Sequence, residues 1–208
     1  MTVTAVAFDF GGVLTYSAFD GVATYSAELG LPEGALVRYF RDDPQMSRLE
    51  VGEITTREFM KYVCTDAERC HGTRIDIRRL AAAASEGERL NPAMIALVEE
   101  LGHRGPVALV TNNVAGAAWR DSFPYHLFTV VLDSSELGVR KPDPRIYATL
   151  LDRLDRRPAQ VAFVDDLPRN TDAAAALGLR PVLFTDMDVC RAELTRLGAL
   201  PAMPSPTA

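Results

Sequence analysis

Five short runs of apolar, β-favouring residues recur along the chain, each about as long as a single strand. They are residues 3–8, 106–110, 128–132, 161–164 and 181–184. Apolar runs without polar alternation are typical of parallel strands that are buried on both faces. Helical patterns lie between the later runs, and we predict helices at 92–103, 144–154 and 169–177. This alternation predicts repeated βαβ units, and therefore an α/β fold with a doubly wound, Rossmann-like parallel sheet.

Residues 16–90 interrupt the alternation with amphipathic segments and no convincing strand. The helices predicted in this insert are near 19–29, 33–40, 55–70 and 75–85,. The chain therefore divides into a core made of 1–15 and 91–198 and a small helical cap, 16–90, inserted after the first strand. Prolines and small residues predict a flexible tail at 199–208,.

Polar residues follow each predicted strand. They are Asp9, Thr111 to Asn113, Asp133 to Ser135, Asp165 with Asp166, and Thr185 with Asp186. The carboxyl ends of parallel strands share one edge of an open sheet, and ligands bind there. Turn and N-cap chemistry explains any single cluster of this kind. Several together, two of them acidic, indicate a binding site.

The acidic residues that follow the first and fourth runs carry a specific implication. Asp9, Asp165 and Asp166 would lie at the same edge, where like charges a few ångströms apart raise each other's pKa,. A hard divalent cation bound by oxygen ligands removes this repulsion, so the sequence predicts an Mg²⁺ site.

Composition excludes several other classes of protein. The chain has 208 residues, a net charge of −6 and no Lys/Arg cluster, which argues against nucleic acid or an anionic membrane as its partner,. No apolar stretch approaches the roughly 20 residues of a membrane helix. Three cysteines fit a reducing compartment, so we expect a cytoplasmic protein,. Cys64, Cys70 and His71 lack a fourth ligand at a recognised zinc spacing,.

Four motifs, taken in order and spacing, resemble those of the haloacid dehalogenase-like hydrolase superfamily. They are Asp9 to Thr15, Thr111-Asn112, Gly138 to Pro144, and Phe163 to Asp166 followed by Asn170. The resemblance spans almost the whole chain. The segment from Glu50 to Ile54 also resembles the subgroup with a small helical cap, which includes the phosphatase domain of bifunctional epoxide hydrolases.

The resemblance implies a Mg²⁺-dependent hydrolase of small phosphate monoesters. Asp9 would be the nucleophile and form an aspartyl-phosphate that water then hydrolyses. Asp9, Asp166 and the backbone carbonyl of Gly11 would bind the metal, with Asp165 as a further or water-mediated ligand.

The remaining motif residues would serve the phosphoryl group. Thr111 and the amides around Asn112 would hold its oxygens. Lys141 would bind phosphate and balance the charge of the nucleophile. Asn170 would support the acidic loop. The implied partner is a small phosphorylated metabolite, and the oligomeric state stays open between monomer and homodimer.

Position 11 departs from the superfamily pattern. Superfamily phosphatases usually carry an aspartate two residues after the nucleophile, as general acid and base, whereas this chain has Gly11. Two consequences are open: a preference for substrates with good leaving groups, or an acid supplied by the cap. Asp20, Asp42, Asp43 and His71 are the cap residues considered for that role.

Three other functions stay open on sequence grounds. A 2-haloacid dehalogenase would use Asp9 on carbon without a metal, and the pair Asp165-Asp166 argues against it. A phosphotransferase would exclude water from the same intermediate. A non-catalytic phosphate- or partner-binding module would have no need of the nucleophile.

Overall fold

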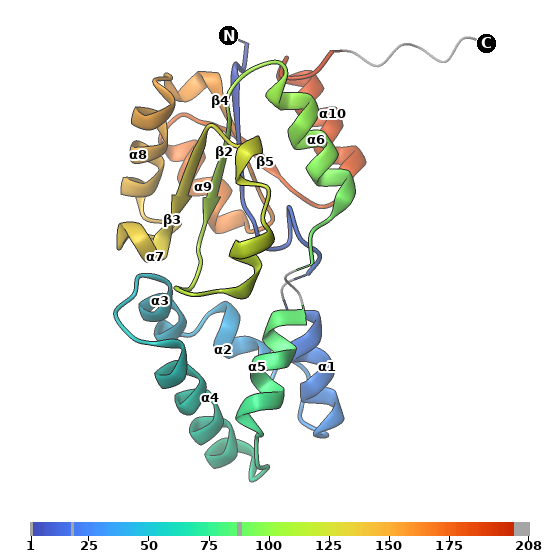
Figure 1. Ribbon diagram of the computed structural model, residues 1–208, viewed down its shortest axis with the longest axis vertical. Helices are drawn as coiled ribbons and strands as arrows, with labels where there is room; N and C mark the ends of the chain where they lie inside the picture. Colours follow the sequence, from blue (N-terminus) through green and yellow to red (C-terminus); the bar gives the residue numbers. More distant parts are fainter. Residues whose placement is uncertain (1, 18, 87–88, 202–208) are drawn as a thin grey trace, which may run out of the picture.

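A five-stranded sheet, parallel throughout, forms the centre of the core (Figure 1). The computed structural model describes residues 2–17, 19–86 and 89–201. The strands are β1 (Ala5–Phe8), β2 (Val107–Thr111), β3 (Val130–Asp133), β4 (Val161–Asp165) and β5 (Arg180–Leu183). Their order in the sheet is β3-β2-β1-β4-β5. Successive strands are added on one side of β1 up to β3 and on its other side from β4, so the carboxyl ends of β1 and β4 lie at the switch point where ligands bind in such sheets. The predicted doubly wound α/β fold is confirmed.

Helices cover both faces of this sheet. They are α6 (Pro92–Gly102), α7 (Ser134–Leu137), α8 (Pro144–Leu154), α9 (Pro168–Ala176) and α10 (Met187–Arg196). Side chains alternate along β1: Val6 and Phe8 pack in a cluster with α6 and α10, whereas Ala5 and Ala7 pack in a second cluster with α8 and α9,. Burial on both faces explains why β1 to β4 are apolar up to their carboxyl ends, whereas β5, at the edge of the sheet, is mostly exposed.

Local capping residues fix where the core helices begin. Asn91 accepts a hydrogen bond from Ala93 N at 3.1 Å, and Pro92 occupies the first turn of α6,. Asp143 caps α8 in the same way, through Arg145 N at 2.9 Å. α8 therefore spans the residues predicted for it.

The insert is a group of helices with a hydrophobic cluster of its own. It contains α1 (Asp20–Glu28), α2 (Val37–Arg41), α3 (Pro44–Glu50), α4 (Thr56–His71) and α5 (Ile77–Ser85). Their buried residues pack mainly against one another, in a cluster separate from the two that flank the sheet. This cap lies below the carboxyl edge of the sheet in Figure 1, and the chain ends lie at the opposite end. Two antiparallel linkers join cap and core, through Tyr16 N to Arg89 O at 3.1 Å and Asn91 N to Leu14 O at 2.8 Å.

The structure differs from the sequence prediction in a few elements. α3, α7 and α10 were not predicted, since each is short or lacks a strong apolar stripe,. The first strand begins at Ala5 because Val3 N bonds to Leu197 O and not to a neighbouring strand. Leu200, assigned to the tail, is buried in the core, and residues 202–208 of that tail lie outside the described part of the chain.

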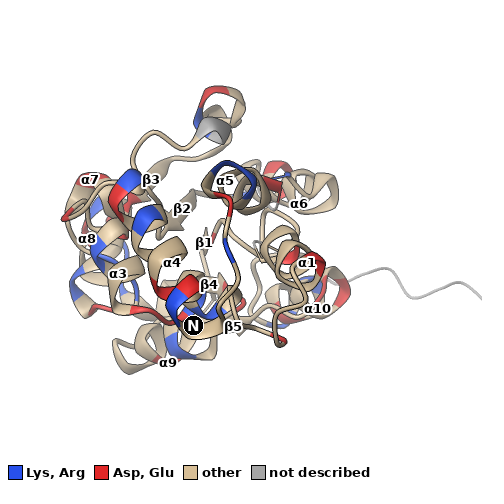
Figure 2. Ribbon diagram, turned by 90° about the horizontal axis from the view of Figure 1, so that it is seen from below, with Lys and Arg blue, Asp and Glu red and all other residues tan. Residues whose placement is uncertain are grey.

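Charges of both signs are interspersed over the cap end of the molecule. Figure 2 shows Lys and Arg alternating with Asp and Glu along the ribbons, without a broad region of one sign. Within the described residues, no helix has both the length and the apolar character needed to cross a membrane.

Candidate active site

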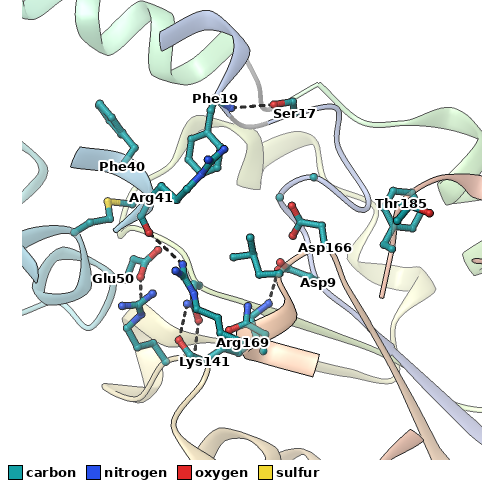
Figure 3. Close-up of a pocket in the computed structure, with 18 residues that line it drawn as sticks. Asp9, Ser17, Phe19, Phe40, Arg41, Glu50, Lys141, Asp166, Arg169 and Thr185 are labelled. Carbon is teal, nitrogen blue, oxygen red and sulfur yellow. Dashed lines mark hydrogen bonds and ion pairs between the residues drawn. The ribbon is translucent and has the colours of Figure 1, made fainter. Parts of the chain in front are cut away.

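Asp9 follows β1 directly and faces a cavity of about 400 Å³ between core and cap (Figure 3). Its backbone N–H continues the sheet by donating to Val164 O at 2.9 Å. Its carboxylate accepts the N–H of Phe10 at 2.6 Å. These two hydrogen bonds to the backbone hold Asp9 in place, with its carboxylate at the cavity wall.

Lys141 connects Asp9 to the fourth strand. Its ammonium lies 2.6 Å from Asp9 Oδ1 and 2.8 Å from Asp165 Oδ2. The side chain is 1% exposed, so the ion pairs are shielded from water. Although burial opposes it, the two carboxylates, Asp165 first, hold the pKa of Lys141 above its ordinary value,. Lys141 is therefore charged and balances one of the two acids.

Asp165 is fully occupied by partners inside the protein. Besides Lys141, it accepts hydrogen bonds from Leu167 N at 2.9 Å and from the side-chain amide of Asn170 at 3.0 and 3.1 Å. It is completely buried and does not line the cavity. Asn170 does line the cavity, and its buried Oδ1 has no hydrogen-bond partner among the described residues. Asp165 therefore orients Lys141 and Asn170, whereas its neighbour Asp166 reaches the cavity.

Asp166 lies against the loop that follows Asp9, and Gly12 makes this approach possible. A Cβ at Gly12 would fall 2.6 Å from Asp166 Oδ2, and the φ of Gly12 is +76°. Only glycine combines that backbone with so close a neighbour. Gly12 is therefore needed where two loops of the acidic site meet.

Three aspartates and one lysine leave this cluster with a net negative charge. Carboxylate oxygens of Asp9, Asp165 and Asp166 lie within 4.8 Å of one another. Burial, opposed by Lys141 and reinforced by Asp165, raises the pKa of Asp9 to about 8. Burial, reinforced by Asp165, also raises the pKa of Asp166. Oxygen donors with uncompensated charge, beside the unpartnered Asn170 oxygen, are the chemistry that a hard divalent cation requires, so the residues fit Mg²⁺.

The two residues at the end of β2 are placed differently from each other. The side chain of Asn112 accepts from Lys141 N at 2.8 Å and donates to Lys141 O at 3.0 Å. This pair of bonds fixes the backbone that carries the lysine. Asn112 also lines the cavity, whereas Thr111 is buried beside it and is not part of the lining.

The cap contributes a buried acid that the sequence analysis did not select. Glu50, at the end of α3, lines the cavity and pairs with Arg140, with Oε2 and Nε 2.7 Å apart. Burial raises the pKa of Glu50, and Arg140 opposes the shift. Ser134 Oγ of the core also donates to the backbone oxygen of Glu50 at 2.6 Å. Arg140 directly precedes Lys141 in the sequence, and this position could have identified Arg140 as a site residue.

Two further arginines, Arg41 and Arg169, line the cavity. Arg41 of α2 places its guanidinium 5.0 Å from the ring centroid of Phe19, and both residues line the same cavity as Asp9 and Asp166 (Figure 3),. Arg169 of α9 pairs with Asp42 at 2.9 Å and donates to Arg41 O at 3.1 Å. These contacts join cap and core beside the acidic site.

The acids considered as substitutes for a side chain at position 11 do not line this cavity. Asp20, Asp42, Asp43 and His71 are all absent from its wall. Asp42 pairs with Arg169, and Asp43 caps α3 through Gln45 N at 2.8 Å. Among the described residues of the cap, Glu50 is the carboxyl group that lines the cavity.

The family model for haloacid dehalogenase-like hydrolases matches residues 3–178. The chain belongs to this family. The match includes both parts of the core that carry the aspartates and the whole cap, so this chain is an enzyme of the hydrolase class.

Three similar proteins illustrate the relationship. Bifunctional epoxide hydrolase 2 of Sus scrofa is 27% identical over 99% of this chain, but the chain spans only 40% of that protein. Phosphatase MT3486 of Mycobacterium tuberculosis is 28% identical, with 96% of this chain and 97% of that protein covered. A haloacid dehalogenase family enzyme of Bacteroides thetaiotaomicron, solved as a magnesium complex, is 20% identical with a TM-score of 0.67 and coverage of 88% and 93%. At that identity, the structural match establishes the fold.

Proposed function

We propose that the protein is a Mg²⁺-dependent phosphatase that hydrolyses small phosphate monoesters through a covalent intermediate on Asp9. The observation that carries the proposal is the contact between Asp9 and Lys141 at the wall of a cavity that Asp166 also lines. A nucleophilic carboxylate, a fixed cation and uncompensated acids in one cavity suit attack on an anionic phosphorus centre. The mycobacterial relative, similar along nearly its whole length, is named as a phosphatase.

The proposed reaction has two displacements at phosphorus. A carboxylate oxygen of Asp9 bonds to phosphorus while the ester P–O bond breaks, and the departing oxygen takes a proton from water. Water then attacks the aspartyl-phosphate, loses a proton, and releases inorganic phosphate with Asp9 regenerated. Dividing the hydrolysis in this way replaces one difficult step by two easier ones.

The side chains around Asp9 have separate roles in this proposal. Asp9, Asp166 and the carbonyl of Gly11 hold Mg²⁺, which supplies charge stabilisation at the phosphoryl oxygens when bound. Lys141 opposes the rise in the pKa of Asp9 and contributes a positive charge to the transferring phosphoryl group,. Asp165 and Asn112 act through Lys141, since one binds its ammonium and the other its backbone. Thr111, which the sequence predicted to hold phosphoryl oxygens, is buried and does not line the cavity.

The first test is hydrolysis of p-nitrophenyl phosphate and a panel of sugar phosphates, with Mg²⁺ or with EDTA. We expect Mg²⁺-dependent turnover that falls by at least about 10⁴-fold in Asp9→Asn, the scale of losing a covalent nucleophile. Turnover that survives in EDTA, or in Asp9→Asn, would reject the proposal. Activity on 2-haloacids without metal would instead support the dehalogenase alternative.

The second test concerns the missing acid at Gly11. Without a proton donor there, we expect the rate to fall steeply as the pKa of the leaving group rises. Gly11, unlike Gly12, has no positive φ, so its backbone conformation is one that other residues also adopt. Gly11→Asp should raise hydrolysis of poor-leaving-group esters by about 10²-fold, the lower range of general acid catalysis. A flat dependence in the wild type would show that another group already donates the proton, with Glu50 as the first residue to substitute.

A further inference from the structure

A second cavity, of about 180 Å³, opens beside the catalytic cavity, and its wall is mainly apolar. The two cavities share five lining residues: Gly11, Phe19, Phe40, Met46 and Asn112. The shared residues come from both core and cap, so the second cavity directly adjoins the site that contains Asp9. A group attached to a phosphate bound at Asp9 can therefore extend into it.

The wall of the second cavity favours an apolar occupant. Phe10, Leu49, Phe59 and Met60 contribute large apolar side chains, and no charged side chain among the described residues lines it. An unfilled apolar cavity destabilises a protein in proportion to its volume. Dry apolar cavities of roughly 150 Å³ in another protein bind small aromatic molecules, so this volume is large enough for a ring.

Three of the four polar residues in the same wall, Asn112, Asn113 and Thr15, already have side-chain partners within the protein, and the fourth is Thr56. Asn112 bonds to the backbone of Lys141 on both sides of its amide. Asn113 donates to Asp133 at 2.9 Å and accepts from Val114 N at 2.8 Å. Thr15 Oγ1 donates to Tyr16 O at 2.9 Å and accepts from Gly12 N at 3.2 Å. A sugar hydroxyl group would find few free partners here, whereas an apolar group leaves all of these bonds intact.

Gly11 lines both cavities and lies two residues after the nucleophile, Asp9. The side chain that superfamily phosphatases usually carry at this position would place a carboxylate between the charged and the apolar space. Glycine leaves this junction free of side-chain atoms. The departure at position 11 thus has a consequence for binding as well as for proton transfer.

We propose that the apolar cavity receives the organic group of the substrate, so that the preferred substrates are phosphate monoesters of apolar alcohols or phenols. This inference rests on the proposed phosphatase function and narrows it to one class of ester. It makes Met60 and its neighbours in the cavity wall determinants of specificity, whereas the charged residues act on the phosphoryl group common to all substrates.

The test is a series of 4-alkylphenyl phosphates, from the unsubstituted phenyl ester to the butyl derivative, with Mg²⁺. The alkyl group changes apolar size while the phenol leaving group keeps a pKa of about 10. We expect kcat/KM to rise about fourfold per methylene, the gain from burying one CH₂ group. In Met60→Gln the gain should fall below about twofold, with Met60→Leu restoring it. Val189→Gln, on an exposed part of α10, is the matched control and should keep the wild-type gain.

The outcomes separate the inference from the function on which it rests. If phenyl phosphate is hydrolysed but kcat/KM does not rise with alkyl length, the apolar subsite is rejected and the phosphatase function stands. The same conclusion follows if kcat/KM rises equally in the wild type and in Met60→Gln. Sugar phosphates turned over with a higher kcat/KM than every alkylphenyl ester would also reject it. If no ester is hydrolysed, binding of the matching 4-alkylphenyl phosphonates with Mg²⁺ decides the question. Affinity that rises with alkyl length supports the subsite without turnover, and equal affinities reject it.

Discussion

Two sets of ion pairs lie at the carboxyl edge of the sheet, and they differ in how much water reaches them. The first joins Lys141 to Asp9 and Asp165, with side chains that are 1%, 10% and 0% exposed. The second joins cap to core through Arg169 and Asp42, which are 41% and 60% exposed. Buried charges depend on each other because nothing else compensates them, whereas exposed charges exchange one partner for water. The contrast indicates a rigid charged centre beside an exposed link to the cap, Arg169–Asp42, that is separated at little cost.

The largest effect is expected from removing the buried cation. Lys141→Met leaves two buried carboxylates without a counter-charge, which should lower the free energy of unfolding by about 3–5 kcal/mol at pH 7. Urea denaturation in EDTA measures this. Lys61→Met, at the other lysine of the chain and exposed on α4, is the matched control and should change it by less than about 0.5 kcal/mol,. If Lys141→Met lowers the free energy of unfolding by less than about 1 kcal/mol, the buried ion pairs are no more strongly coupled than the exposed ones.

The pair Glu50–Arg140 is intermediate, since its acid is buried and its base is 21% exposed. Arg140→Gln leaves a buried carboxylate without its cation and should cost about 1–3 kcal/mol. Glu50→Gln should cost less, because water still reaches Arg140 and because burial already raises the pKa of Glu50, which favours a neutral group there. Urea denaturation of both variants compares them. A larger loss for Glu50→Gln than for Arg140→Gln would contradict this assignment.

A smaller effect is expected on the pH dependence of stability without metal. The folded protein raises the pKa of Asp9 from 3.8 to about 8, so it binds that proton more tightly than the unfolded chain does. The stability that this adds is complete at low pH and is lost as pH rises from about 4 to about 8,. Asp9→Asn removes this loss, so its melting temperature in EDTA should gain on the wild type between pH 5 and pH 8, by about 2–4 °C for each kcal/mol of stability that the wild type loses.

Mg²⁺ provides the control for that measurement. A cation bound at Asp9 replaces the proton, so Mg²⁺ should raise the melting temperature of the wild type at pH 8 more than that of Asp9→Asn. Parallel pH profiles for the two proteins in EDTA would show that Lys141 alone compensates Asp9.

The smallest effect is expected at the exposed link between cap and core. Arg169→Gln removes the ion pair with Asp42 and the bond to Arg41 O, and should cost no more than about 1 kcal/mol,. Urea denaturation at low and high NaCl measures this, and the difference from wild type should shrink at high salt. A loss above about 2 kcal/mol, insensitive to salt, would mean that this link is as strongly coupled as the buried set.

Much of the fold was predictable because it depends on local patterns. The five apolar runs locate the observed strands to within two residues at either end. Burial makes the runs of β1 to β4 almost uniformly apolar, whereas β5 is mostly exposed. α8 was predicted at its observed bounds, because Asp143 and Pro144 mark its start. α3 was missed although Asp43 and Pro44 mark its start in the same way. It is seven residues long, too short for a helical period to stand out,.

The sequence by itself determined that Asp9, Asp165 and Asp166 would gather at one edge, because parallel strands bring their carboxyl ends together. Only the tertiary structure decided how these acids differ: Asp165 is enclosed by Lys141 and Asn170, whereas Asp166 reaches the cavity. It also decided that Glu50 faces the site and that an apolar cavity adjoins Gly11. Those features depend on how the cap packs against the core, between residues distant in the chain. Periodicity specifies which face of a helix is buried, but it does not specify which residues of another segment that face will meet.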